Sequence, residues 1–151
     1  MTTPAPPAIL YAEDDPDDRL LATMAYRQSG VVNPLVLVAD GEEALEYLRD
    51  TGRHAGRAGG PKPGIVVLDL NMPGMDGNEV LRVIKADPGL RRIPVVILTT
   101  STSQTDIASS YDAGANSYIV KPTAFSSLVH LFDRLCGYWF EMGSIATEVR
   151  P

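Results

Sequence analysis

Short apolar runs rich in β-branched residues alternate with longer segments of helical periodicity, and this alternation restricts the fold more than any other feature of the chain. The runs are almost continuously apolar, as expected for strands of a parallel sheet that is covered by helices on both faces. The predicted strands span residues 8–12, 35–39, 65–70, 93–99 and 117–120.

A helical pattern follows each predicted strand. The first is the best marked, because Asp15 suits the N-cap, Pro16 suits the first helical position and Gly30 follows the expected end. The other helices are expected near 41–50, 77–86, 103–113 and 124–142, whereas 51–64 reads as an exposed loop with solvated basic residues. Five such units predict one doubly wound α/β domain over 8–142, between a flexible segment at 1–7 and a tail at 143–151.

Polar residues stand at the ends of four predicted strands. Glu13 and Asp14 follow the first strand, Asp69 ends the third, Thr99 the fourth and Lys121 the fifth. Sites in such sheets lie beyond the carboxyl ends of the strands, so we expect these side chains to lie close together. Three carboxylates would repel one another without a cation, and hard oxygen ligands favour Mg²⁺. The strand ends therefore predict a magnesium site.

A magnesium site beside Asp69 suits phosphoryl chemistry, because Mg²⁺ usually binds one or two carboxylates together with phosphate oxygens. Asp69 is predicted to be the nucleophile, and Lys121 and Thr99 to hold the remaining phosphoryl oxygens. Taken singly, Asp69 could be a turn residue, Lys121 a surface lysine and Thr99 a strand residue. Their joint placement favours the site, whereas we interpret three other acids as solvated helix-cap residues: Asp15, Asp17 and Asp18.

Composition excludes several classes of function. The net charge of −6 and a pI near 4.8, without a basic stripe, argue against direct nucleic-acid binding. The sequence has neither a signal peptide nor an apolar run of about 18 residues, so we expect a cytoplasmic protein without a membrane span. Cys136 is predicted to be a structural thiol, and His54 and His130 to have no catalytic role.

Four motifs resemble those of the receiver domains of two-component response regulators: ILYAEDD, VVLDLNMPGMDG, IPVVILTTS and YIVKP. The similarity extends from Ile9 to about Phe140. It implies a flavodoxin-like sheet with strand order 2-1-3-4-5. It also implies that Asp69 is the phosphorylated aspartate, that Asp14 and the backbone carbonyl of Asn71 coordinate Mg²⁺, and that Glu13 reaches the ion through water.

The same resemblance implies a switch. Tyr118 is expected to turn inward when Thr99 moves toward the phosphoryl oxygens, and the Lys121–Pro122 bond is expected to be cis, which would aim Lys121 into the site. Three positions depart from the family pattern, where Asp, a small residue and Phe are more common; they are Glu13, Thr100 and Thr123. We expect these departures to affect metal affinity and rates without removing the function.

The YWFEM segment resembles the ending of single-domain response regulators that are paired with phytochrome-type sensor kinases. This implies that a sensor histidine kinase, a bacteriophytochrome, phosphorylates the chain, and that the fourth helix, fifth strand and fifth helix form a homodimer interface. Tyr138, Trp139 and Phe140 are expected either to pack as helix-end core residues or to form an apolar interface.

Two other functions use related features. A Mg²⁺-dependent phosphatase with an aspartyl-phosphate intermediate would use the same nucleophile, but Asn71 stands where such enzymes usually place a second Asp as general acid. A flavin-binding module would share the topology, but the acidic run after the first strand would repel a cofactor phosphate. We therefore favour the phosphoacceptor.

Overall fold

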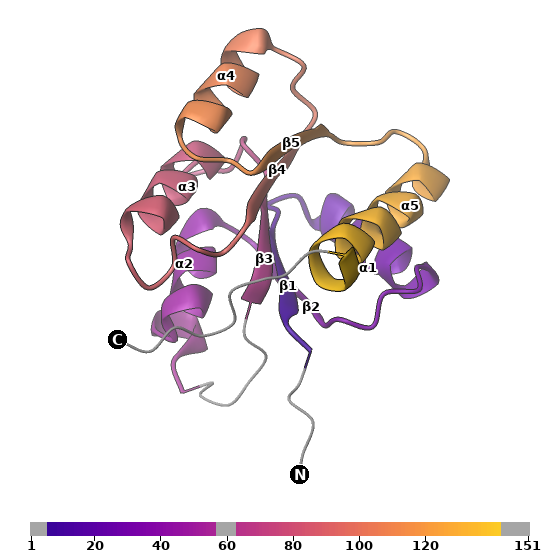
Figure 1. Cartoon of the computed structure of the whole chain (residues 1–151), viewed down its shortest axis with the longest axis horizontal. Coiled ribbons are helices and arrows are strands. Elements are labelled where there is room, and N and C mark those ends of the chain that lie inside the picture. Colours follow the sequence, from indigo (N-terminus) through magenta and orange to yellow (C-terminus); the bar gives the residue numbers. More distant parts are fainter. Residues whose placement is uncertain (1–5, 57–62, 143–151) are drawn as a thin grey trace.

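The computed structural model describes residues 6–56 and 63–142, and within them five parallel strands form one sheet in the order β2-β1-β3-β4-β5 (Figure 1). The strands are β1 (Ala8–Ala12), β2 (Leu35–Val38), β3 (Pro63–Leu68), β4 (Val95–Thr99) and β5 (Ser117–Val120). The predicted fold class and strand order are therefore confirmed. The predicted terminal segments at 1–7 and 143–151 lie almost wholly outside the described residues.

The helices are α1 (Pro16–Gln28), α2 (Gly41–Arg49), α3 (Gly77–Ala86), α4 (Gln104–Asp112) and α5 (Phe125–Cys136). Side chains that directly precede four of them accept a hydrogen bond from the first turn, which satisfies donors that the helix leaves free; they are Asp15, Asp40, Asp76 and Ser103. The predicted last helix is divided, because α5 ends at Cys136 and Gly137–Met142 continues as a π-helix. No helix in the described ranges is long and apolar enough to cross a bilayer.

Two apolar cores cover the two faces of the sheet, because successive strand residues point to opposite faces. Leu10, Val66 and Ile97 face one core, which α2 and α3 complete with buried side chains such as Leu45 and Leu81. The other face packs against α1 and α5 through a second set: Ile9, Tyr11, Ile65, Val67, Val96, Leu98, Ala22, Ala25, Phe132 and Cys136. The helices accordingly lie on both sides of the sheet in Figure 1, and the buried position of Cys136 agrees with the predicted structural thiol.

Helix α4 differs from the other helices because it contributes little to either core. Ser110 is its one buried residue, and its hydroxyl lies 3.0 Å from Oδ1 of Asn78 on α3. Tyr111 on the same helix is 49% exposed. Helix α4 thus lies on the sheet without being embedded in it.

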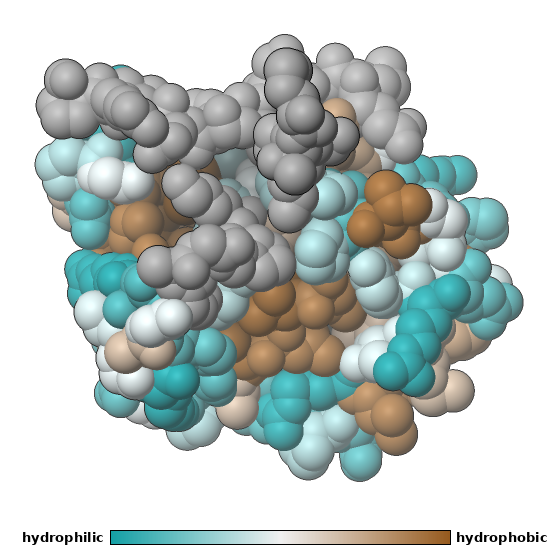
Figure 2. All heavy atoms as spheres, turned by 90° about the horizontal axis from the view of Figure 1, so that it is seen from below, coloured by the Kyte–Doolittle hydropathy of each residue, from teal (hydrophilic) through white to brown (hydrophobic). Residues whose placement is uncertain are grey.

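Elsewhere on the molecule, the view from below shows apolar residues gathered between hydrophilic ones (Figure 2).

Candidate functional site

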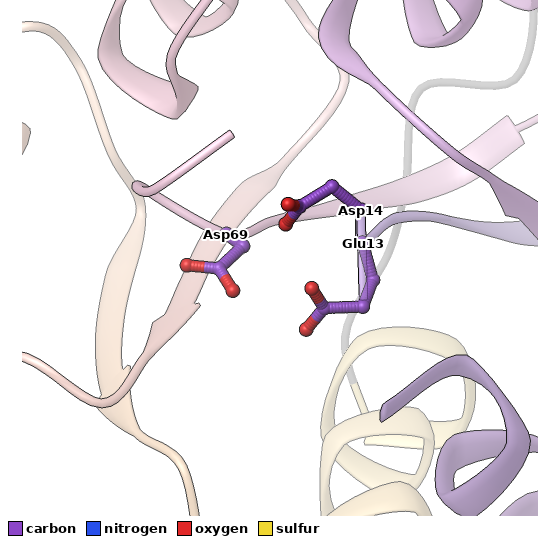
Figure 3. Close-up of side chains that lie close together, drawn as sticks. All are labelled: Glu13, Asp14 and Asp69. Carbon is purple, nitrogen blue, oxygen red and sulfur yellow. The ribbon is translucent and has the colours of Figure 1, made fainter. Parts of the chain in front are cut away.

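Three carboxylates meet at the carboxyl ends of β1 and β3. Glu13, Asp14 and Asp69 each offer an oxygen within 4.8 Å of the others, and their side chains point into a common space (Figure 3). Glu13 and Asp69 are buried, with 1% and 6% of their surface exposed. The structure thus brings together the three acids that were predicted, from their positions at strand ends, to lie close to one another.

Asp69 is held by the turn that follows β3. Its backbone N–H donates to the carbonyl of Ala12 at 3.3 Å, which extends the pairing of β3 with β1 by one residue. The backbone N–H of Asn71 then donates to Oδ1 of Asp69 at 3.1 Å, so the carboxylate accepts a bond from its own turn. The predicted third strand was therefore two residues too long at this end.

Gly77, the first residue of α3, lies directly against this turn. A Cβ atom at Gly77 would stand 2.3 Å from the backbone oxygen of Asp69, far inside van der Waals contact. Only glycine allows α3 to approach the end of β3 so closely. Gly77 therefore helps to fix the distance between Asp69 and the start of α3.

Lys121 reaches the acids from the end of β5. Its Nζ donates to Oδ2 of Asp69 at 2.8 Å and to Oε1 of Glu13. Burial lowers the pKa of the ammonium, but the bonds to Asp69 and Glu13 outweigh this and hold the pKa above its ordinary value. The lysine is therefore a fixed positive charge between two of the three carboxylates.

The prediction of a cis bond between Lys121 and Pro122 is wrong, because the described residues contain no cis peptide bond. Trans is the favoured isomer before proline. The lysine stem spans the distance to Asp69 with the bond in trans, and the backbone N–H of Lys121 donates to the carbonyl of Thr99 at 2.7 Å. A cis bond is not needed to direct the ammonium into the site.

Burial dominates the electrostatics of Glu13. It raises the pKa of this carboxyl to about 7, although the bonds from Lys121 and from the backbone N–H of Asp15 act in the opposite direction. A buried carboxylate beside two others gains from a cation, and the donors here are hard oxygens. The residues therefore fit a divalent metal of the Mg²⁺ or Mn²⁺ type.

A polar cavity of about 490 Å³ opens beside Asp14. It is lined by Asp14, Leu70, Asn71, Met72, Pro73, Asp76, Asn78 and Asp106. Asn71, whose carbonyl the family pattern assigns to the metal, is exposed and shares this cavity with Asp14. Of the three acids, Asp14 therefore faces this cavity directly.

Thr99 and Tyr118 are connected through the loop that follows β4. Thr99 is fully buried, and its Oγ1 accepts from the backbone N–H of Ser101 at 3.5 Å, the outer limit of a hydrogen bond. The hydroxyl of Tyr118 donates to the carbonyl of Ser101 at 2.9 Å. Both predicted switch residues therefore hold the same loop.

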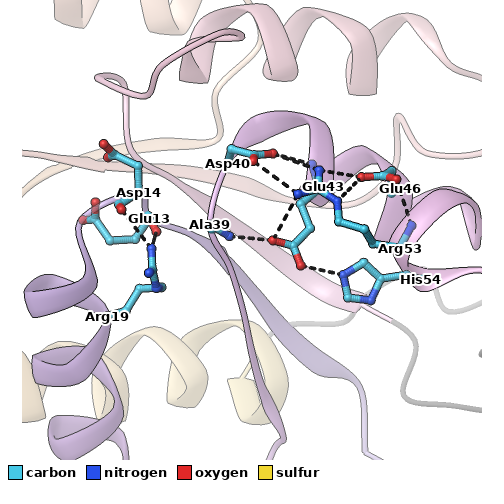
Figure 4. A network of polar contacts seen from close by, with 9 residues as sticks. All are labelled: Glu13, Asp14, Arg19, Ala39, Asp40, Glu43, Glu46, Arg53 and His54. Atoms are coloured by element: carbon cyan, nitrogen blue, oxygen red, sulfur yellow. Dashed lines mark hydrogen bonds and ion pairs between the residues drawn. The ribbon is translucent and has the colours of Figure 1, made fainter.

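Helix α1 contributes two residues to the site that the sequence analysis missed. Asp18, interpreted as a solvated acid, lies with its Oδ2 3.3 Å from Nζ of Lys121. Arg19 donates through Nη1 to the carbonyls of Glu13 and Asp14 at 2.7 and 2.9 Å (Figure 4). Residue spacing gives no signal for either residue, because Asp14 precedes the N-cap Asp15 and therefore does not share a helix face with Asp18.

The predicted loop at 51–64 is more ordered at its start than expected. Gly52–His54 forms a 3-10 turn, and the guanidinium of Arg53 bonds to Glu46 at 2.6 Å and to Asp40 (Figure 4). His54 lies 2.9 Å from Glu43, so these two basic residues are paired with α2 rather than simply solvated. Residues 57–62 lie outside the described part of the chain.

The three aromatic residues at the end of the last helix differ in burial. Trp139 and Phe140 are partly buried against the core shared by α1 and α5, whereas Tyr138 is 58% exposed. Thr100 and Thr123, two of the departures from the family pattern, are exposed. His130 is also exposed.

Comparison with known proteins identifies the family. Residues 9–133 match the response regulator receiver domain. The chain is 35% identical to the response regulator Rcp1 of a Synechocystis species over 136 residues, which cover 90% of each protein. A structure of Rcp1 in its Mn²⁺-bound form superposes with a TM-score of 0.80 at 34% identity, covering 94% of this chain and all of that one.

Two other solved structures are also similar. The phosphorylated cyanobacterial phytochrome response regulator RcpA has a TM-score of 0.84 and 39% identity, covering 95% of this chain and all of that one. A response regulator in red light signaling of R. palustris has a TM-score of 0.87 and 37% identity, covering 94% of this chain and 99% of that one. With its five-stranded sheet and the acids at the strand ends, the chain belongs to the response regulator receiver domain family, which implies acceptance of a phosphoryl group and binding of a divalent metal.

Proposed function

We propose that Asp69 accepts a phosphoryl group from a sensor histidine kinase in a Mg²⁺-dependent reaction, and that the modified protein changes its affinity for partner proteins in the cytoplasm. The observation that carries this proposal is the contact of Lys121 with both Asp69 and Glu13, directly beside Asp14. This arrangement combines a nucleophilic carboxylate, a cationic ligand for phosphoryl oxygens and an acidic metal site.

The transfer assigns a role to each of these side chains. A carboxylate oxygen of Asp69 attacks phosphorus in line with the nitrogen of the donor histidine, the P–N bond breaks, and the imidazole leaves. The ammonium of Lys121 moves from Asp69 to a phosphoryl oxygen, and the hydroxyl of Thr99 donates to another. Asp14, Asp69 and the Asn71 carbonyl, with Glu13 through water, would hold Mg²⁺, which would supply charge stabilisation at the same oxygens.

The signal would then pass through the loop after β4. When Thr99 turns toward the phosphoryl group, its weak bond to the backbone N–H of Ser101 is lost, and the neighbouring bond from Tyr118 is strained. Tyr118 can then turn inward and move the loop that leads to α4. Helix α4 is held by little buried surface, so a small change in this loop can shift it.

The decisive experiment is intact mass spectrometry after incubation with phosphoramidate and Mg²⁺. Wild type should gain one phosphoryl group, Asp69→Asn none, and wild type in EDTA none. Asp76→Asn is a matched control, because Asp76 lines the same cavity and asparagine can replace it as a helix cap. Labelling of Asp69→Asn at the wild-type level would refute the assignment.

The proposed donor is a bacteriophytochrome-type kinase, supported by the likeness to RcpA and to the R. palustris regulator. A purified phytochrome-type kinase should transfer its phosphoryl group to the chain much faster than a histidine kinase from an unrelated pathway. Equal transfer rates from both kinases would contradict this choice of partner.

We further propose a homodimer through α4, β5 and α5. Exposed apolar side chains on these elements and just after them support the contact: Tyr111, Val120, Phe125 and Tyr138. Sedimentation equilibrium should give twice the chain mass for wild type, and Val120→Lys should give the chain mass because it places a charge within the contact. A monomeric wild type at high concentration would contradict the proposal.

A phosphatase acting through the same intermediate is not favoured by the family assignment. The residue two positions after the nucleophile is Asn71, which cannot act as a general acid. We therefore expect one phosphoryl group per chain and no sustained turnover of phosphate esters. Multiple turnovers in a p-nitrophenyl phosphate assay would favour the enzyme instead.

A further inference from the structure

The two acids that follow β1 are neighbours in sequence, and their carboxylates lie on the same side of the chain. Glu13 and Asp14 are consecutive, and consecutive residues in an extended chain point to opposite faces of the sheet. Both nevertheless bring a carboxylate oxygen within 4.8 Å of the other and of Asp69 (Figure 3). The strand ends at Ala12, so the backbone at these two residues has already left strand geometry.

Arg19 holds this turn from α1. Its Nη1 donates to the carbonyl of Glu13 at 2.7 Å and to that of Asp14 at 2.9 Å (Figure 4). Its backbone N–H also donates to the carbonyl of Asp15 at 2.9 Å, within the first turn of the helix. Three successive carbonyls are therefore bonded to one half-buried residue, and the guanidinium is a rigid donor that keeps its charge.

We infer that Arg19 is a positioning residue for the divalent metal, acting by clamping the backbone of the two consecutive acids so that both carboxylates face one ion. This inference rests on the proposed metal site. Its cationic group is bonded to the carbonyls of residues whose side chains are anionic, so it also offsets part of the repulsion among the acids. Removal of a partner that orients metal ligands typically weakens metal binding 10- to 100-fold.

Calorimetric titration of the full chain with Mg²⁺ tests the inference. Arg19→Ala should raise the Kd for Mg²⁺ by about 10-fold or more, as expected for loss of an orienting partner. Arg19→Lys should recover part of the affinity, because it keeps the charge and one donor group but lacks the planar fork. Arg27→Ala is the control, because Arg27 is exposed in the last turn of the same helix.

A spectroscopic readout separates positioning from general destabilisation. Bound Mn²⁺ gives an electron paramagnetic resonance spectrum that broadens when its ligand geometry becomes less uniform, and Arg19→Lys should show this broadening at saturating metal. Should Arg19→Ala fail to fold, as judged by circular dichroism, Arg19→Gln and Arg19→Lys provide the same comparison.

The inference is overturned if folded Arg19→Ala binds Mg²⁺ within twofold of wild type, or if Arg27→Ala weakens binding as much as Arg19→Ala does. A wild type that binds no divalent metal would instead contradict the proposed function. The two failures are therefore distinguishable in one set of titrations.

Discussion

Replacing Glu13 by Gln should stabilise the metal-free protein, although Glu13 belongs to the proposed metal site. The pKa of this carboxyl is raised from 4.5 to about 7, because burial disfavours its charged form more than Lys121 and the Asp15 N–H favour it. Between these two pH values the folded protein retains a proton that the unfolded chain releases. The corresponding stability is fully present below pH 4.5 and is lost as the pH rises through about 7.

The size of the effect follows from the shift. Each pKa unit corresponds to 1.36 kcal/mol, so ionised Glu13 costs the folded state about 3 kcal/mol at pH 8 and less than about 1 kcal/mol at pH 5. Glutamine has nearly the same shape, carries no charge and can still accept a hydrogen bond from Lys121. Glu13→Gln should therefore raise the free energy of unfolding by about 3 kcal/mol at pH 8 and by much less at pH 5.

Urea denaturation in EDTA at the two pH values measures this difference directly. Glu42→Gln is a suitable control because Glu42 is an exposed acid in the first turn of α2. Excess Mg²⁺ should reduce or reverse the difference in free energy of unfolding between the variant and wild type at pH 8, since wild type gains stability by binding the ion and the variant gains less. A variant that is no more stable than wild type at pH 8 in EDTA would refute the reasoning.

Three further variants test other contacts. Gly77→Ala should lower the free energy of unfolding in urea by about 2 kcal/mol, because the added Cβ would overlap the Asp69 carbonyl. The control Gly30→Ala should change the free energy of unfolding little, because there is room for a Cβ at Gly30. Asp18→Asn should accelerate phosphorylation by phosphoramidate about threefold in a mass time course, because Lys121 loses a competing anion; a slower reaction would contradict this. Tyr118→Phe should cost about 1 kcal/mol in the same urea assay through its lost bond to Ser101, and an unchanged midpoint would show that the bond has no net value.

The fold and the central acids could be predicted because they depend on local patterns and on one general rule of topology. Apolar runs mark the strands, and parallel strands place Glu13, Asp14 and Asp69 at one edge of the sheet. The error at the end of the third strand arose where a side-chain hydrogen bond replaces the backbone hydrogen bonds of the sheet. Asp69 was included in β3, but its carboxylate instead accepts a bond from the following turn.

The roles of Asp18 and Arg19 could not be predicted for a different reason. Both look like ordinary charged residues of an exposed helical turn, and their contacts depend on the rotamers of long side chains and on how α1 sits against the sheet. The peptide bond before Pro122 is a similar case, because the two isomers differ by only about 1 kcal/mol and tertiary contacts decide between them. Neither kind of information is present in residue spacing.

The shallow seating of α4 has a consequence for how such a protein can be adapted. Because one small polar residue, Ser110, is its buried contribution, the helix can change its exposed side chains, or its position, at almost no cost to the two cores on the faces of the sheet. Recognition of a new target and retention of the folded scaffold are therefore nearly independent requirements in this molecule. Substitutions on the outer face of α4 should change which partner is bound and leave the midpoint temperature of thermal unfolding unchanged.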